Sequence, residues 1–506
     1  NSSFAKMIQQ SSIKTSEQGA PPADIARVAG RGTIYITAAK LWFMASGAGI
    51  YWALPRLMTE EQFGMYQVVI GVVSIINAVV VTGTSQTVSK YISQEESKAD
   101  SVKRTALKLQ LPVGGGLALA FFLLAPVLSG HLNEPRLANN LRLASLITLS
   151  YSFYAVFTGF FNGQKRFLTQ ASLDMTYSTL KLAFIVVLVW LGYGVAGGVG
   201  GFALAAACVL AVSAFSARGG ERTGDVRIKE LFRFQAYLLV FTLVLNLLQK
   251  VDLILIQALS SPDATVATRN AGHYGAAVYI ANLTYQIIIS VTFVIFPLVS
   301  QATFAKDRSR ARDYVSNTLR YSLMIMALPA TLFSANASEV LRVFYPDAYQ
   351  SGSAALAVVA YGMLLFGLLY IITTIISASG RPNMSLLIGG VTLTASAALN
   401  AMLIPAYGLK GAAIGTTASM FLGVMMGGGY LLSKFGVLMP GLSFLRIAAC
   451  AGLIYVASFA VSPTSKVMIM IKLAVLSLIY LIGLVISREI GGGDVAAFKR
   501  VLKKSG

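Results

Sequence analysis

The sequence predicts an all-α membrane protein of about fourteen transmembrane helices, arranged as two six-helix lobes and a final helix pair. Three observations predict this fold. The 506-residue chain is 56% hydrophobic and only 12% charged, whereas a soluble domain carries about 25% charged residues. Its apolar runs are long and continuous, which favours helices over a barrel of short alternating strands. Landmarks in the first 215 residues also return, in the same order, roughly 210 positions later.

The internal repeat is visible in three pairs of short motifs. The pairs are Phe63–Tyr66 with Ala271–Tyr274, Asn162–Lys165 with Ser379–Pro382, and Tyr193–Gly197 with Tyr407–Gly411. Because the segments between these motifs are apolar, we interpret the repeat unit as a bundle of membrane helices. Many transporters place the substrate site at the seam between two such halves.

Apolar runs of about 20 residues predict the individual helices. A tail (1–32) precedes an N-lobe (33–216) with spans near 33–55, 65–88, 109–129, 142–162, 173–192 and 196–216. A linker (217–232) leads to a C-lobe (233–432) with spans near 233–258, 272–301, 315–336, 353–378, 383–405 and 410–432. The last helices, near 442–461 and 467–487, lie in the segment 433–487, and a basic tail (488–506) follows.

The lysines and arginines predict the orientation. Alternate gaps between spans, beginning with the N-terminal tail, hold 28 of the 40 basic residues, and the opposite gaps hold 8. Such a bias predicts that both termini are cytoplasmic. The net charge of +20 is therefore mostly a signal of membrane orientation. It is a weak signal for nucleic acid, and we expect no nucleic-acid partner because no basic domain with interleaved aromatic residues is present.

Four cations fall inside predicted spans, where a charge costs roughly 2.5–3.5 kcal/mol at mid-bilayer. They are Lys40, Lys181, Lys250 and Arg320. We expect all four to be candidates for lining a cationic chamber that binds an anionic headgroup, such as a pyrophosphate or an acidic sugar. Lys40 and Lys250 occupy the first helix of each repeat, where the wall of a central cavity is expected. Snorkelling to the interface is the alternative for all four, and it applies best to Lys181 and Arg320.

The predicted seventh helix is also the most polar. Asn246, Gln249 and Lys250 share one face at i, i+3, i+4 spacing, so Asn246 and Gln249 are candidates for a polar lining or for ion coupling. Lys250 and Asp252 are two residues apart, so on a straight helix they do not face each other. Asp252 is a candidate for coupling to an ion, although a simple interfacial position is also open. Asp174, at the predicted start of the fifth helix, is expected to be an ordinary boundary residue.

Several functions lack the residues that they need. The two cysteines, Cys208 and Cys450, lie in apolar runs, and the two histidines are far apart, so neither a metal site nor a cofactor is expected. Carboxylates are scarce in the spans and no nucleotide-binding motif is present, so the protein is not expected to be an enzyme or an ATP-driven pump. An ion gradient, the membrane potential or the substrate gradient must then drive transport.

Four motifs, in order along the chain, resemble those of polysaccharide transporters in the multidrug/oligosaccharidyl-lipid/polysaccharide (MOP) exporter superfamily. The likeness covers about residues 25–490. The motifs are Leu54–Leu57 with Glu61–Tyr66, Phe160–Phe167, Phe296–Ser300 and Tyr407–Ala413.

The resemblance implies a Wzx-type flippase of the bacterial inner membrane. Such a protein moves an undecaprenyl-pyrophosphate-linked oligosaccharide to the outer leaflet by alternating access. Lys40 and Lys250 would then meet the pyrophosphate or acidic sugars. The resemblance also implies membrane lipids and a polysaccharide polymerase or export machinery as partners, and a monomer. The polar segment from Ser260 to Ala271 is longer than the family's helix 7–8 loop.

Three other functions remain open. A flippase for lipid II, the peptidoglycan precursor, shares the fourteen-helix plan and also needs cations in its chamber. A multidrug antiporter usually needs acidic residues to bind its coupling cation, and the cationic bias disfavours it. A membrane-bound glycosyltransferase needs a catalytic carboxylate or arginine cluster, often on a large outer loop, and no predicted outer loop exceeds about 20 residues.

Overall fold

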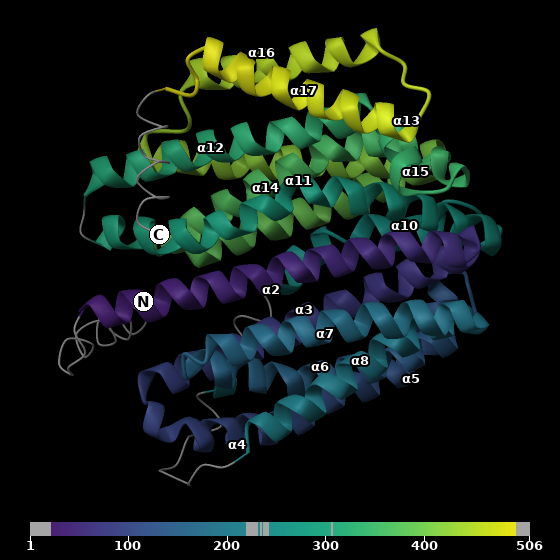
Figure 1. Ribbon diagram of the computed structural model, residues 1–506, viewed down its shortest axis with the longest axis vertical. Coiled ribbons are helices and arrows are strands. Elements are labelled where there is room, and N and C mark those ends of the chain that lie inside the picture. Colours follow the sequence, from purple (N-terminus) through teal and green to yellow (C-terminus); the bar gives the residue numbers. More distant parts are fainter. Residues whose placement is uncertain (1–21, 219–230, 233–234, 236–241, 305–306, 492–506) are drawn as a thin grey trace.

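The chain folds into a bundle of long helices (Figure 1). The computed structural model describes residues 22–218, 231–232, 235, 242–304 and 307–491, and no strand occurs in these ranges. Within these ranges, eight helices are long and apolar enough to cross a membrane, or ten if each of two bent helix pairs counts as one span. Helices suit this composition because each satisfies its own backbone hydrogen bonds in hydrocarbon. The predicted class of fold is confirmed, while the count of fourteen spans stays a prediction.

The N-lobe forms the purple-to-blue half of the bundle in Figure 1. A π-turn at Leu111–Gly115 joins two of its helices into one long segment. The helices of this lobe are α2 (Pro22–Leu57), α3 (Glu60–Gln94), α4 (Ala99–Gln110), α5 (Gly116–His131), α6 (Leu137–Gly163), α7 (Phe167–Leu188) and α8 (Gly194–Ser216).

The C-lobe lies beside the N-lobe, and the last two helices form a hairpin on its outer surface (Figure 1). Helix α14 is at the centre of this lobe. In its most apolar stretch of 18 residues 72% is buried, whereas the corresponding value for α17 is 28%. The helices are α10 (Val251–Leu259), α11 (Ala264–Phe304), α12 (Arg308–Ala335), α13 (Ala337–Phe344), α14 (Ser353–Ala378), α15 (Pro382–Phe435), α16 (Gly441–Ala457) and α17 (Lys466–Ile486).

The backbone repeats along with the sequence. Gly194 has φ 51° and ψ −131°, and Gly408, its counterpart in the second half, has φ 54° and ψ −132°. Only glycine adopts this conformation readily. Gly194 separates α7 from α8, where the sequence predicts a break between spans 173–192 and 196–216. Gly408 divides α15 in two, where the sequence predicts a break between spans 383–405 and 410–432. The parallel repeat of two lobes is therefore present in the structure.

Three predicted segments differ from the structure. The predicted span 233–258 is wrong as one straight helix, because its described part bends by 49° between Thr242–Leu248 and α10. The predicted polar loop from Ser260 to Ala271 is mostly helical, since Asp263 Oδ1 accepts from the Thr265 backbone N–H at 2.8 Å and α11 begins at Ala264. Between spans 315–336 and 353–378, α13 lies at 89° to α12.

Candidate functional site

The predicted seventh span is broken at Gln249 and Lys250. The backbone N–H groups of these residues donate to the carbonyls of Asn246 and Leu247, three residues back instead of four. Lys250 has φ −130°, outside the helical range. Non-helical backbone at membrane depth is tolerated where protein or a water-filled cavity surrounds it, and transporters often bind substrate or ions at such breaks. The break coincides with the cation that the sequence analysis placed in the chamber.

Asp252, two residues beyond the break, is the centre of a buried polar cluster. Its side chain accepts hydrogen bonds from the Tyr274 hydroxyl at 2.7 Å, the Thr416 hydroxyl at 3.2 Å and the Leu253 backbone N–H at 2.8 Å. The residue is 1% exposed. Asn400 donates to Thr416 Oγ1 at 3.2 Å, and its own Oδ1 is buried with no hydrogen-bond partner in the described part of the chain. Carboxylate, amide and hydroxyl oxygens suit a small hard cation or a proton.

The other polar residues of this span are bound to neighbouring groups. Asn246 Nδ2 donates to the Thr242 carbonyl at 2.8 Å, and Gln249 Oε1 accepts from the Tyr285 hydroxyl at 2.8 Å. Lys250 is close enough to Asp252 for an electrostatic interaction. The bend therefore determines the directions in which these side chains point, because they do not lie on one straight helix.

In the N-lobe, Lys40 and Lys181 lie in one region, where α2 packs on α7. Lys40 is exposed and interacts electrostatically with Asp174. The Lys181 Nζ lies 4.3 Å from the ring centre of Phe202 and 5.5 Å from that of Phe43. The negative faces of the rings attract the ammonium charge.

Asp174 is not a boundary residue, and that expectation is wrong. It lies two turns inside α7, and its Oδ1 accepts from the Tyr154 hydroxyl at 2.7 Å. Asp174 and Lys40 therefore form a charged pair in the N-lobe.

Arg320 belongs to a separate cluster. Its Nε lies 2.5 Å from Glu489 Oε1, and Arg446 Nη1 lies 3.6 Å from the other oxygen of the same carboxylate. The Glu489 side chain is fully buried. These contacts tie α12 and α16 to the end of α17, so they favour a structural role for Arg320 over a place in the chamber.

The lobes come into backbone contact at the end of the bundle where α3 begins, which the charge pattern predicts to be the outer end. A methyl group at Gly64 would overlap the carbonyl oxygen of Thr268, and one at Gly272 would come within 2.9 Å of the Glu60 carbonyl oxygen. Gly64 and Gly272 are equivalent positions of the repeat. The two glycines therefore permit a backbone-to-backbone crossing of α3 and α11.

A buried histidine reinforces this crossing. His273 Nε2 lies 2.8 Å from Glu60 Oε2, and His273 Nδ1 lies 2.5 Å from the Ser351 hydroxyl. A neutral ring satisfies both contacts when Nε2–H donates to Glu60 and Nδ1 accepts from Ser351. Together with the two glycines these residues join α3, α11 and the turn before α14. We refer to Glu60, Gly64, Gly272, His273 and Ser351 as the α3–α11 seal.

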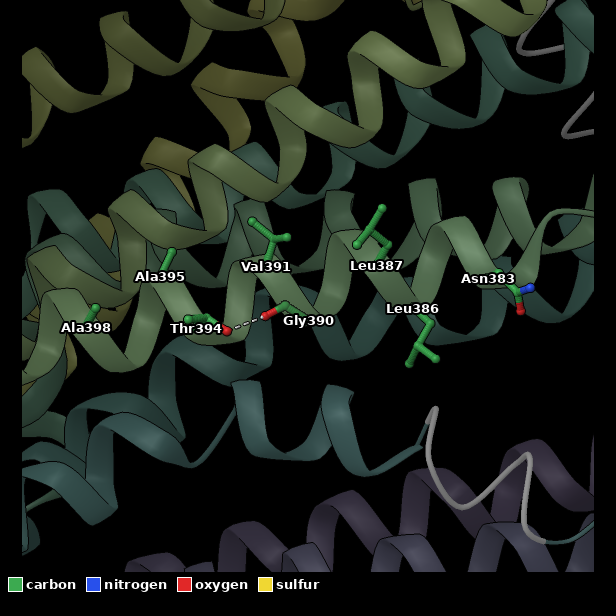
Figure 2. A pocket seen from close by; sticks show the side chains of 8 residues that line it. All are labelled: Asn383, Leu386, Leu387, Gly390, Val391, Thr394, Ala395 and Ala398. Carbon is green, nitrogen blue, oxygen red and sulfur yellow. Dashed lines mark hydrogen bonds between the residues drawn. The ribbon is translucent and has the colours of Figure 1, made fainter.

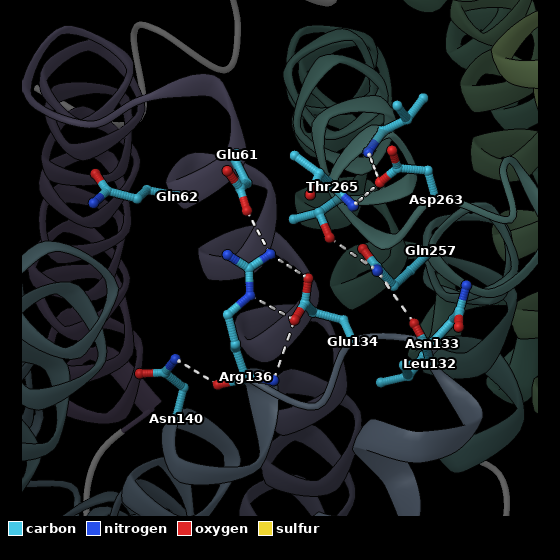
Figure 3. Close-up of polar contacts among 12 residues, drawn as sticks. Glu61, Gln62, Leu132, Asn133, Glu134, Arg136, Asn140, Gln257, Asp263 and Thr265 are labelled. Atoms are coloured by element: carbon cyan, nitrogen blue, oxygen red, sulfur yellow. Dashed lines mark hydrogen bonds and ion pairs between the residues drawn. The ribbon is translucent and has the colours of Figure 1, made fainter.

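An ion-pair cluster includes Glu61, the neighbour of Glu60 in the chain, and Figure 3 shows its members. Arg136 Nη2 lies 2.5 Å from Glu61 Oε1 and 2.7 Å from Glu134 Oε2, and Arg136 Nε donates to Glu134 Oε1 at 2.8 Å. The Glu134 side chain is 1% exposed. The hydrogen bonds from Arg136 hold the pKa of the Glu134 carboxyl below its ordinary value.

The loop that carries Glu134 also reaches the other lobe. Gln257 Nε2, on α10, donates to the Leu132 carbonyl at 3.2 Å and Asn133 Nδ2 donates to the Pro262 carbonyl at 3.1 Å, as Figure 3 shows for Gln257. The predicted outer end is thus closed by side-chain contacts in addition to the helix crossing.

The sequence of this chain matches a known protein family. Residues 29–303 match the family model described as polysaccharide biosynthesis protein, which is more than half of the chain. The chain belongs to this family.

Relatives of this polysaccharide biosynthesis family member include the uncharacterised membrane protein YabM of Bacillus subtilis, which is 24% identical over 390 residues, or 72% of either chain. A second relative is described as "Probable low-salt glycan biosynthesis flippase Agl15" of Haloferax volcanii. It is 24% identical over 168 residues, which cover 32% of this chain and 35% of Agl15.

Solved structures show the same fold. The lipid II flippase MurJ in an inward closed conformation has a TM-score of 0.74 at 16% identity, covering 90% of this chain and 99% of MurJ. An inward-facing multidrug resistance MATE transporter of the MOP superfamily has a TM-score of 0.61 at 14% identity, covering 78% and 95%. The family member therefore has the MOP transporter fold, as its motifs indicate.

This family member also has an apolar groove of about 840 Å³ on the first half of α15. Figure 2 shows the residues that line the groove. The Thr394 hydroxyl donates a hydrogen bond to the Gly390 carbonyl. An apolar lining suits hydrocarbon and not a charged headgroup. The lining residues are Asn383, Leu386, Leu387, Gly390, Val391, Thr394, Ala395 and Ala398.

We expect acid to weaken the Arg136 cluster. A carboxyl whose pKa is lower in the folded chain stabilises the fold above its unfolded pKa of about 4.3, and this contribution is lost as the pH falls through the folded pKa. Glu134→Gln should therefore lower the melting temperature at neutral pH, and its difference from the wild type should shrink as the pH falls from neutral through the folded pKa of Glu134. Thermal unfolding of both proteins across this range checks the prediction. A constant difference would assign the effect to packing.

The sequence analysis missed the residues that lie far apart in the chain but meet in the fold. Tyr274 and Thr416 carried no signal that they bind Asp252. Gly64, Gly272 and His273 stood out only as repeat landmarks, and the repeat does not say which of its members touch each other.

Proposed function

We propose that this protein is a flippase that moves a polyprenyl-pyrophosphate-linked oligosaccharide across the plasma membrane by alternating access. The family match over residues 29–303, together with the two-lobe transporter fold, carries the proposal. The relative Agl15, which is described as a glycan biosynthesis flippase, supports the substrate class. A charged sugar headgroup cannot cross about 30 Å of hydrocarbon unaided, whereas a polyprenyl tail can stay in lipid.

In this mechanism, Lys40, Lys181 and Lys250 attract the pyrophosphate or acidic sugars, and the α3–α11 seal closes the outer side while the headgroup enters from the cytoplasm. Breaking the seal contacts releases α3 from α11 and opens the outer side. The α15 groove is an apolar surface against which the lipid tail can lie.

The Asp252 cluster supplies the coupling to an ion. Binding of a proton or a small cation changes the charge next to the bend at Lys250, which is where α10 can pivot. The charge change is thereby linked to the position of α10, and α10 contacts the N-lobe through Gln257 and Leu132.

A lipid II flippase is the second candidate, because MurJ matches the fold over 99% of its own length. Both candidates act on a polyprenyl-linked headgroup, and they differ in the sugar that they accept.

Deleting the gene tests the proposal, and a Lys40→Ala variant tests the cationic region within it. We expect the deletion to strand a lipid-linked glycan on the cytoplasmic face, and wild-type protein to reverse this. Lys40→Ala should fail to reverse it at an unchanged protein level, because the headgroup loses a positive partner. Mass spectrometry of extracted lipid-linked sugars measures the accumulation and identifies the glycan.

Lys410→Ala, which removes an exposed lysine near the break in α15, is the matched control and should restore export. Accumulation of lipid II would select the second candidate. Increased drug sensitivity with no stranded glycan would replace the flippase with a drug exporter, and full export by Lys40→Ala would remove Lys40 from the substrate path.

A further inference from the structure

A small pocket lies at the corner between α12 and α13, next to the hairpin of α16 and α17. It has a volume of about 160 Å³, which is room for roughly five water molecules. It contains neither the Asp252 cluster nor the α3–α11 seal. Its polar lining consists of Asn336, Ser338, Glu339, Ser458, Ser462 and Lys472.

The pocket holds a cation and an anion that face each other. Lys472 Nζ lies 2.9 Å from both carboxylate oxygens of Glu339, and the two side chains are 8% and 22% exposed. An ammonium group has three N–H donors. The third donor of Lys472 has no other partner among the residues that the structure describes, so it remains for a ligand oxygen.

Two further features give the pocket a donor side and an acceptor side. Asn336 is 2% exposed, its Nδ2 donates to the Leu332 carbonyl, and its Oδ1 is buried without a hydrogen-bond partner in the described ranges. That oxygen needs a donor. The first turn of α13 has no side-chain cap, so its N–H groups add positive potential near Lys472.

The surroundings of this pocket are those expected of a site at a membrane interface. Helix α13 lies at 89° to α12, in the direction of a helix that rests along the bilayer surface. Large apolar side chains nearby are exposed, including Phe459 at 67% and Val467 at 68%. The acyl chains of a lipid with its headgroup in the pocket would lie along the apolar surface of α16 and α17.

We propose that the pocket binds the headgroup of a phospholipid with a primary ammonium group, such as phosphatidylethanolamine. The phosphate is placed near Lys472 and the start of α13, and the ammonium donates to Asn336 Oδ1 and Glu339. Phosphatidylglycerol has no cation for these acceptors, and the quaternary ammonium of phosphatidylcholine has no N–H to donate. The proposal is independent of the transported substrate.

Native mass spectrometry of the full-length protein tests this site. The purified protein is mixed with equal amounts of phosphatidylethanolamine, phosphatidylglycerol and phosphatidylcholine that carry the same acyl chains. We expect at least fivefold more phosphatidylethanolamine than either other lipid to be retained. Equal retention of the three lipids would overturn the proposal.

Two variants localise the binding. Ser462→Phe fills the pocket from an exposed position, and Glu339→Gln keeps its shape while removing the carboxylate. Both should reduce the preference for phosphatidylethanolamine to about twofold or less, at melting temperatures that show a folded protein. Lys466 is at the start of α17, the helix that carries Lys472, but it does not line the pocket. Lys466→Met should therefore keep the preference. A preference that survives Ser462→Phe would place the lipid elsewhere.

Discussion

Replacing Gly64 by alanine will separate α3 from α11 at the predicted outer end. The added methyl group overlaps the Thr268 carbonyl oxygen, which is backbone and cannot rotate away. Forcing an extra group into a well-packed contact typically costs 1–3 kcal/mol, which is a factor of about 5–150 in an equilibrium between closed and open ends. The seal should therefore open more often, and transport should fall because the closed state is needed in each cycle.

Cysteine labelling measures this opening. In a background without Cys208 and Cys450, a cysteine at Ala276, which is fully buried on α11 one turn beyond Gly272, reports access to the seal. We expect Gly64→Ala to raise the rate of maleimide labelling at least fivefold. Gly116→Ala and Gly452→Ala are matched controls, because an added methyl group at either position meets nothing within 4 Å. Equal labelling of Gly64→Ala and the wild type would mean that the crossing does not close the outer end.

Replacing Asp252 by asparagine will uncouple transport from its driving ion. Asparagine keeps the size of the side chain and can accept from Tyr274 and Thr416, but it carries no charge for a cation or proton. We expect transport in reconstituted vesicles to fall at least tenfold, equivalent to about 1.4 kcal/mol. We also expect a sodium or proton gradient to stop accelerating the residual transport.

Ion binding can be measured separately from transport. A cation that binds the folded wild type raises its melting temperature, and Asp252→Asn should abolish this rise. Asp313→Asn, which neutralises an exposed carboxylate on α12, should preserve both the rise and the transport. If Asp252→Asn transports with full ion dependence, Asp252 is a structural acceptor for Tyr274 and the coupling site lies elsewhere.

Features with a local chemical signal were predictable from the sequence. Long apolar runs predicted the helices, and the glycines near positions 194 and 408 predicted the breaks, because the backbone there takes a conformation that other residues avoid. The repeat predicted two lobes. The orientation and the lobe boundaries remain predictions that rest on charge and periodicity alone.

Features produced by packing were not predictable. No glycine or proline marks the bend at Lys250, so the local sequence favours a straight helix there. Asp174 is a residue type common at helix boundaries, and its hydrogen-bond partner Tyr154 comes from another helix, so the sequence near Asp174 does not reveal the contact. Helix α13 is too short to give a reliable periodicity. For the chamber residues, the sequence identified charges that are costly in lipid, but it could not say that Arg320 meets Glu489.

The bend at Lys250 makes the two duplicated halves unequal. The first span of the other half carries Lys40 on α2, which continues through that point without interruption, and two residues further on the Trp42 indole donates to the Thr179 hydroxyl. The first span of the second half therefore has a bend next to a buried carboxylate, whereas the first span of the first half is one continuous helix. We expect the change of shape during transport to take place at this bend, while α2 moves as a rigid helix.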